Sequence, residues 1–175
     1  MEDAKDQSAF TLIETLVVIA ITAVLSTIFI VYSGSSNSNL NLYTSRAEVV
    51  STLERAKSLA LDKSAYGSYG AKGSYCAFGV HFDLAGGRNY YLYGVATSSN
   101  NCSGVSYAWP GYGIQTSTLT GQAQFVSPTP ADIYFVPPYF LGSATGKIVI
   151  QDKKSGAKVA IGVDAGGSVS ALSSP

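Results

Sequence analysis

The sequence has little of what catalytic sites are usually built from. It contains one histidine, one tryptophan and two cysteines, and charged residues make up 13% of the chain, against about 25% in a typical soluble domain. Neither a GxxxxGK[ST] phosphate loop nor an HExxH or EF-hand spacing occurs. The lone histidine, His81, lies in a strand pattern, and nothing in the sequence singles out a nucleophile or an orienting group for it. We therefore expect no enzyme, no metal site and no cofactor.

Net charge is also lacking. The 11 Lys and Arg residues balance the 11 Asp and Glu residues, which predicts no strong overall attraction to nucleic acid or to anionic lipid. Ser, Gly, Asn and Tyr take the place of the missing charges. This composition favours an extracytoplasmic β domain over a cytosolic enzyme.

The longest apolar run, residues 10–32, holds one charged residue, Glu14, and no glycine or proline. At about 1.5 Å per residue, a helix of this length matches a hydrocarbon core of about 30 Å. The run exceeds the roughly 7–15 apolar residues of a secretory signal. A core helix this apolar would need partners all round, which a chain of this size with a β-rich remainder does not offer. We interpret residues 10–32 as a membrane span.

A second helical pattern follows the span. Val49, Leu53, Ala56 and Ala60 recur at helical spacing, with Val50 and Leu61 widening the apolar stripe. The pattern predicts an amphipathic helix that ends near residues 62–64 and lies across a sheet. Residues 33–41 are polar and contain Gly34, so they are expected either to fray or to bend within one continuous helix.

The rest of the chain alternates like strands and is punctuated by turns. The predicted strands are residues 74–82, 89–96, 133–136, 147–151, 158–163 and 168–171, whereas 107–124 is expected to be irregular. In the first strand, alternation places Cys76, Phe78, Val80 and Phe82 on one face. The tyrosines gather before and inside the first two strands, and cross-strand packing is favoured over a sticky binding surface.

The residues around Glu14 carry a resemblance. Phe10-Thr11-Leu12-Ile13-Glu14, after a short polar leader and before the apolar run, resembles the processing signal of the type IV pilin superfamily. The resemblance implies that a prepilin peptidase cuts between Ala9 and Phe10 and methylates the new amine of Phe10. It implies further that Glu14 pairs with an N-terminal amine on a neighbouring subunit. The leader departs from the usual pattern, because Ala9 stands where glycine is usual and three acidic residues outnumber one lysine.

The implied fold is α+β and pilin-like, with one long N-terminal helix packed on an antiparallel β-sheet head. Its parts would be a leader (1–9), a transmembrane half of the helix (10–32), a linker with the amphipathic half (33–62) and an extracytoplasmic head (63–175). The implied function is a structural subunit, of the minor kind, in a type IV pilus or type II secretion pseudopilus. Implied partners are other pilins, the peptidase, an inner-membrane assembly platform with its motor ATPase, and membrane lipid before assembly. The chain would cross the inner membrane once, with its head in the periplasm or outside the cell.

A looser resemblance extends to the head. Residues 54–61, the strands after them, and the closing segments 159–163 and 166–170 resemble minor pilins and H-type pseudopilins. Some members of that group bind DNA through basic residues of the last hairpin. Here that turn has no Lys or Arg, but four lysines lie in the preceding hairpin: Lys147, Lys153, Lys154 and Lys158. A DNA- or surface-binding tip subunit is the first alternative function, and a single-pass protein that does not polymerise is the second.

The two cysteines, Cys76 and Cys102, leave two interpretations open. In an oxidising compartment they could form one disulfide, which loop-closure reasoning values at about 3 kcal/mol. The disulfide is the favoured interpretation, and the alternative is two separate buried thiols, which behave as small apolar side chains.

Overall fold

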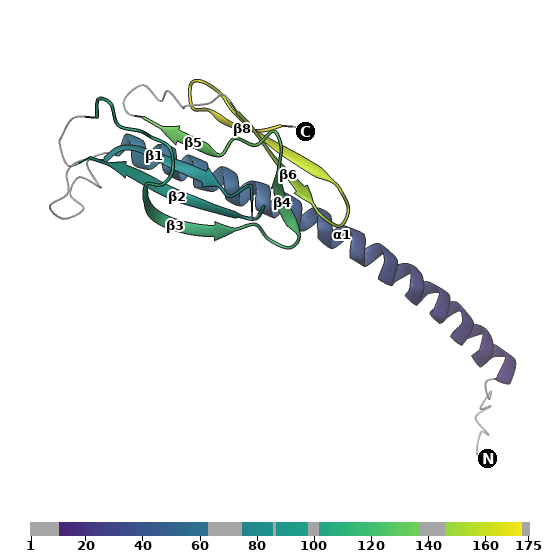
Figure 1. The fold of residues 1–175 in the computed structure, drawn as a ribbon. Coiled ribbons are helices and arrows are strands. Elements are labelled where there is room, and N and C mark those ends of the chain that lie inside the picture. Colours follow the sequence, from purple (N-terminus) through teal and green to yellow (C-terminus); the bar gives the residue numbers. More distant parts are fainter. Residues whose placement is uncertain (1–10, 63–74, 86, 98–101, 137–145, 173–175) are drawn as a thin grey trace, which may run out of the picture. The chain divides into compact units, whose positions relative to one another are not determined.

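The computed structural model describes residues 11–62, 75–85, 87–97, 102–136 and 146–172, with side chains left undescribed for residues 31–38. One helix is followed by eight strands (Figure 1). The elements are α1 (Leu12–Leu61), β1 (Tyr75–Phe82), β2 (Asn89–Ala96), β3 (Tyr112–Thr118), β4 (Ala123–Val126), β5 (Asp132–Phe135), β6 (Gly146–Asp152), β7 (Lys158–Val163) and β8 (Val169–Leu172). The predicted α+β arrangement is confirmed.

The helix α1 contributes to two compact units, Met1–Asn37 and Ser38–Pro175. Residues 33–41, which the sequence allowed to fray, are helical. The helix ends at Leu61, one residue before the predicted range, and the Asp62 amide donates a last hydrogen bond to the Ser58 carbonyl at 2.9 Å. Ser45 and Glu48, whose spacing resembles a helix cap, lie inside the helix instead.

The strands of the second unit, which we call the head, form two antiparallel four-stranded sheets. Their orders are β3-β2-β1-β5 and β4-β6-β7-β8. Consecutive strands pair through short connections in β1–β2, β6–β7 and β7–β8. The chain leaves the first sheet for the second at β4 and returns with β5 before closing with the last three strands.

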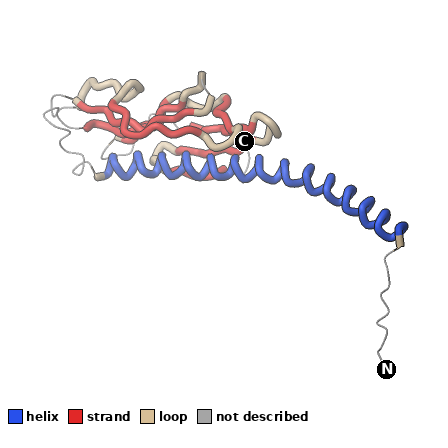
Figure 2. The backbone as a smooth tube through the Cα atoms, turned by 90° about the horizontal axis from the view of Figure 1, so that it is seen from below, coloured by secondary structure: helices blue, strands red, loops and turns tan. Residues whose placement is uncertain are grey.

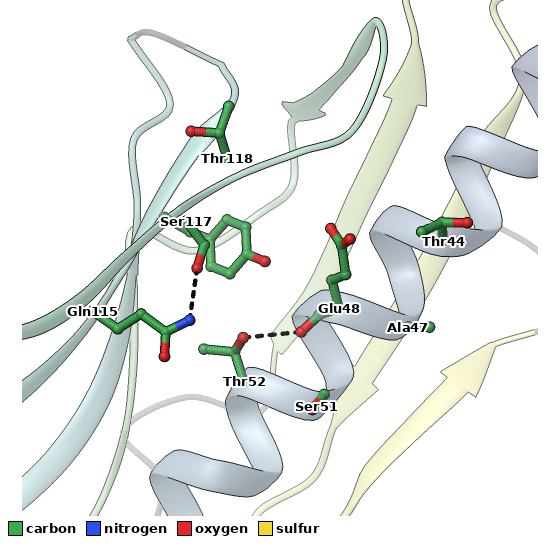
Figure 3. A pocket seen from close by; sticks show the side chains of 9 residues that line it. Thr44, Ala47, Glu48, Ser51, Thr52, Gln115, Ser117 and Thr118 are labelled. Carbon is green, nitrogen blue, oxygen red and sulfur yellow. Dashed lines mark hydrogen bonds between the residues drawn. The ribbon is translucent and has the colours of Figure 1, made fainter.

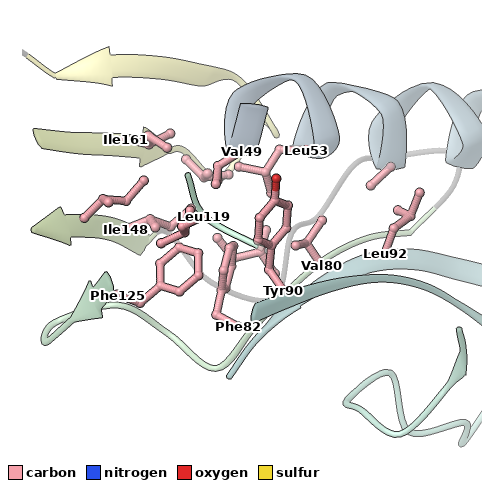
Figure 4. Close-up of a cluster of buried hydrophobic side chains, with 14 of the residues drawn as sticks. Val49, Leu53, Val80, Phe82, Tyr90, Leu92, Leu119, Phe125, Ile148 and Ile161 are labelled. Carbon is pink, nitrogen blue, oxygen red and sulfur yellow. The ribbon is translucent and has the colours of Figure 1, made fainter. Parts of the chain in front are cut away.

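The main core lies between the second half of α1 and the two sheets (Figures 2 and 4). The predicted stripe is confirmed, because Val49, Leu53, Ala56 and Ala60 are fully buried. Leu61, which was expected to widen the stripe, is exposed. The sheets contribute aromatic and branched side chains to the same cluster: Phe78, Val80, Phe82, Tyr90, Leu92, Phe125, Ile133, Phe135, Ile148, Ile150 and Ile161. Burial of these apolar side chains is the main source of the head's stability.

A second, smaller cluster covers the opposite face of the first sheet. Ala77, Tyr93 and Val95 are buried there beneath side chains that include Tyr107 and Trp109. The strands β1 and β2 are therefore buried on both faces. The sequence predicted a sheet with only one buried face, because the covering residues come from the segment it left irregular.

Two expectations for the strands are wrong. The segment 107–124, expected to be irregular, contains β3 and the start of β4. In β1, the register shifts between Tyr75 and Ala77, so Tyr75 joins Phe78, Val80 and Phe82 in the main core in place of Cys76. A bulge at this point adds one residue and turns the following side chains to the other face.

Candidate functional site

The first turn of α1 holds Glu14, the one charged residue of the apolar run. Thr11 precedes the helix, and its hydroxyl oxygen accepts a hydrogen bond from the Glu14 amide at 3.4 Å. Thr11 is therefore the N-cap and Glu14 the third helical residue, the spacing of a capping box. Thr11 was not predicted as a capping residue, although the T-x-x-E spacing signals it. A carboxylate in this position is favoured by the positive end of the helix dipole.

Among the described residues, none donates a hydrogen bond to the Glu14 carboxylate or forms an ion pair with it. The side chains of residues 11–30 are all exposed. Leu12–Ile30 is the one helix segment in the described part of the chain that is long and apolar enough to cross a membrane. The segment is therefore a helix of 19 residues whose surface is mostly apolar and whose first turn carries the carboxylate of Glu14.

The predicted processing residues, Ala9 and Phe10, lie outside the described residues. Their role in cleavage and methylation therefore stays a prediction.

The two cysteines form a disulfide. Cys76 in β1 is bonded to Cys102, with the Cα atoms 5.5 Å apart and a sequence separation of 26. The bridge fastens the segment after β2 to the first sheet. This segment continues into residues 105–109, which we call the covering segment because Val105, Tyr107 and Trp109 pack over Ala77 and Tyr93. Of the two interpretations that the sequence left open, the structure contains the bridged one.

The four lysines proposed for DNA binding do not lie together. Lys153, Lys154 and Lys158 are exposed at the β6–β7 hairpin, where Lys158 pairs with Gln151. Lys147 is half-buried and pairs with Gly162 near the other end of the same two strands. Four residues of strand, about 13 Å, separate Lys147 from Gln151. The structure therefore groups three of the lysines and separates the fourth.

A shallow groove of about 620 Å³ runs between α1 and the edge strand β3 (Figure 3). Its lining mixes polar side chains with Ala47 and the ring of Tyr90, and several of the polar side chains bond to protein atoms. The Thr52 hydroxyl donates to the Glu48 carbonyl at 2.9 Å, and the Gln115 amide donates to the Ser117 hydroxyl at 3.1 Å. Among the described residues that line the groove, no hydroxyl is hydrogen-bonded to a histidine or to another base that would activate it.

Burial raises the pKa of Tyr90, whose ring borders this groove. Hydrogen bonds with Thr52 and Ser117 oppose this shift, and the charge of Glu48 adds to it. Desolvation of a phenol disfavours its ionised form, so Tyr90 stays a neutral part of the contact between β2 and α1.

His81 has a structural environment that the sequence did not reveal. Its Nδ1 lies 3.0 Å from an Asp132 carboxylate oxygen, and its ring stacks on Trp109 at a centroid distance of 5.3 Å. The Tyr93 hydroxyl donates to the Tyr107 carbonyl at 2.9 Å. Burial, together with the nearby charge of Asp132, strongly raises the pKa of Tyr93. These contacts hold the covering segment to the sheet.

Among the described residues, no three His, Cys, Asp or Glu side chains gather as metal ligands.

Comparison with protein families matches residues 4–30 to the prokaryotic N-terminal methylation motif. The comparisons with curated proteins and with solved structures find no match. The motif implies processing by a prepilin peptidase and assembly with other pilin subunits. It is a feature of structural subunits and not of a known enzyme class, and with the apolar helix it fits a membrane-anchored protein that assembles at the surface.

The matched residues end at Ile30, the last residue of the apolar segment. The second half of α1 then packs on antiparallel sheets. With its N-terminal methylation motif, its apolar N-terminal helix and its α+β head, the chain fits a type IV pilin or pseudopilin.

Proposed function

We propose that this chain is a minor subunit of a type IV pilus or type II secretion pseudopilus, and that it polymerises through the first half of α1. The observation that carries the proposal is the methylation motif on a segment whose side chains from 11 to 30 are all exposed. Such a surface is unstable in water and requires lipid or other apolar helices around it. The looser likeness of the head to minor pilins and H-type pseudopilins supports the minor role.

Glu14 is proposed to set the register between subunits. A carboxylate at the centre of a membrane costs about 2.5–3.5 kcal/mol on insertion scales, and a buried charge without a partner is strongly destabilising. Cleavage between Ala9 and Phe10 would create an amine four residues before Glu14. Pairing of Glu14 with that amine on a neighbouring subunit neutralises both charges at one axial position.

Before assembly, the apolar half of α1 lies in the inner membrane, and the head lies in the periplasm. The assembly platform and its motor ATPase then move the subunit out of the bilayer. Helix contacts replace lipid contacts during this step, so the apolar surface stays dry throughout. The mature location is the pilus or pseudopilus.

The experiment that tests the proposal compares two glutamates of the same helix. Glu14→Ala should abolish fibres sheared from the producing cells, because the helices lose their charge pair. Glu48→Ala is the matched control, because Glu48 is an exposed glutamate of α1 within the head, and it should leave fibre yield unchanged. Ordered fibres of Glu14→Ala at full yield would overturn the proposed assembly mechanism.

Mass spectrometry of membrane extracts tests the processing step separately. The expected mature terminus is methylated Phe10, and Ala9→Gly should increase the cleaved fraction because glycine is the usual residue at this position. An intact Met1 terminus in all of the protein would favour the single-pass alternative that does not polymerise.

A further inference from the structure

Three turns meet at one end of the head, beside residues 41–45 of α1. The Lys153 amide donates to the Gln122 carbonyl at 3.0 Å, which joins the β6–β7 hairpin to the β3–β4 turn. Arg88, in the β1–β2 hairpin, donates to the carbonyls of Leu119 and Gly121. The Thr120 amide in turn donates to the hydroxyl of Ser45 on α1 at 3.0 Å. These contacts fix the three turns and the helix as one surface.

The exposed charges of this surface are mostly basic. Arg88, Lys153, Lys154 and Lys158 are exposed. Asp152, beside the lysines, is 2% exposed and accepts hydrogen bonds from the amides of Lys154 and Ser155. Glu48 on α1 is an exposed acid of the same region, and Asp83, in the hairpin that carries Arg88, is a half-buried one. Four exposed cations therefore face two accessible acids, although the chain as a whole has no net charge.

Apolar side chains accompany the cations. Of the five large apolar side chains that are exposed on the described part of the head, three lie at this end: Leu40 and Tyr43 on α1, and Leu84 in the same hairpin as Arg88. Leu40 is 62% exposed, Tyr43 55% and Leu84 44%. Exposed leucine and tyrosine next to lysine and arginine are typical of surfaces that enter the membrane interface. Nucleic acid would use the cations alone and leave the leucines in water.

This surface follows the apolar segment closely along the chain. Leu40 comes ten residues after Ile30, the last residue of that segment, and ten helical residues rise about 15 Å. The headgroup layer covers about 5–7 Å beyond the hydrocarbon, and charges act over a further ~8 Å in physiological salt.

We propose that this end of the head, which we call the basic end (Leu40, Tyr43, Leu84, Arg88, Lys153, Lys154 and Lys158), contacts anionic phospholipid headgroups before assembly. The proposal rests on the membrane-anchored state of the proposed function. In this contact the lysines and Arg88 bind lipid phosphates, and Leu84 and Tyr43 enter the headgroup layer. Lipid contact of this kind holds the head at the bilayer surface, and it is released when the subunit leaves the membrane.

The test uses the full chain in lipid nanodiscs of phosphatidylcholine alone, or with about one third phosphatidylglycerol. Amide hydrogen exchange is followed at the β6–β7 hairpin and, as an internal reference, at the β7–β8 turn. Phosphatidylglycerol should slow exchange of the hairpin several-fold and leave the reference turn unchanged. About 1 M NaCl, where the Debye length falls to ~3 Å, should remove most of the effect.

Variants separate lipid contact from other causes. K153Q/K154Q/K158Q should lose the slowing, L84S should reduce it, and K147Q is the matched control that keeps it. Equal exchange in both nanodiscs, or equal slowing in the triple variant, would overturn the proposal. Slowing by short duplex DNA in phosphatidylcholine nanodiscs, without slowing by phosphatidylglycerol, would instead assign the basic end to nucleic acid. Neither outcome changes the Glu14 fibre assay, so failure here is distinguishable from failure of the assembly proposal.

Discussion

The two halves of α1 have the same backbone conformation and opposite surroundings. From residue 11 to residue 30 every side chain is exposed, although most are apolar. From residue 42 to residue 60 the apolar side chains form a stripe buried by the head. Among the described residues, only the second half packs against other parts of its own chain. The first half must obtain its stability from surroundings that the chain does not contain, namely lipid or other subunits.

Replacing one leucine in each half gives the largest expected contrast. Leu53 is fully buried and Leu16 is 61% exposed. Leu53→Ala should lower the free energy of unfolding of the head by about 2–5 kcal/mol, because it leaves a cavity in the core. Leu16→Ala should change it by less than about 0.5 kcal/mol. Denaturant unfolding in detergent, followed by the fluorescence of the single tryptophan, Trp109, measures both, and equal losses would contradict the comparison.

Breaking the disulfide should weaken the head alone. Cys76→Ser/Cys102→Ser opens a loop of about 26 residues, and the expected loss is about 3 kcal/mol. The same unfolding assay measures the loss, and fibre formation at permissive temperature should persist because the bridge lies far in sequence from Glu14. If the double variant unfolds like the unmodified protein, the bridge does not support the covering segment.

A smaller contrast comes from two serines of the helix. Ser45 is fully buried and accepts a hydrogen bond from the Thr120 amide, whereas Ser26 is exposed and donates to the Thr22 carbonyl at 2.7 Å. Ser45→Ala should cost about 1–3 kcal/mol of head stability, because the amide loses its acceptor. Ser26→Ala should cost nothing measurable in that assay, and a loss equal to that of Ser45→Ala would show that the halves are coupled.

Alkaline pH gives the smallest and most gradual effect. Burial raises the pKa of Tyr90, which packs against the second half of α1, above its ordinary value near 10. Below pH 10 the phenol is protonated in both states and its contribution to stability is complete. Above pH 10 the unfolded chain releases the proton first, so the free energy of unfolding falls, by up to about 1.4 kcal/mol per pH unit for this group.

Tyr90→Phe should flatten that decline, measured by denaturant unfolding between about pH 9 and 11. Tyr112→Phe is the control, because Tyr112 is 49% exposed and its loss should leave the decline unchanged. An identical slope in the Tyr90 variant would show that Tyr90 titrates as in the unfolded chain.

The sequence predicted those parts of the fold where periodicity and burial coincide. The helical stripe at Val49, Leu53, Ala56 and Ala60 is confirmed, and β2 and β7 have the predicted bounds. β3 was missed because it is an edge strand of mostly exposed Ser, Thr and Gln, so no alternation of apolar and polar residues marks it. The bulge before Ala77 was missed because extra residues leave no pattern in composition.

In the candidate site, too, features that depend on local sequence could be predicted, and features that depend on strand pairing could not. The methylation motif and the apolar helix could be predicted from the local sequence, because both are continuous along the chain, whereas the role of Glu14 in assembly stays a prediction. The pairing of His81 with Asp132, 51 residues apart, depends on the contact between β1 and β5. The separation of Lys147 from Lys153, Lys154 and Lys158 depends equally on the register of β6 and β7. Long-range placement of this kind requires the sheets to be known.

The described residues buried in the main core of the head run from Leu42 to Val163, with Val169 packed against them. A subunit can be complete as a folded object while its first helical half exchanges one set of neighbours for another. In the proposed assembly, polymer growth and dismantling would then require no refolding, and a copy withdrawn from a fibre would return to the bilayer ready for another round.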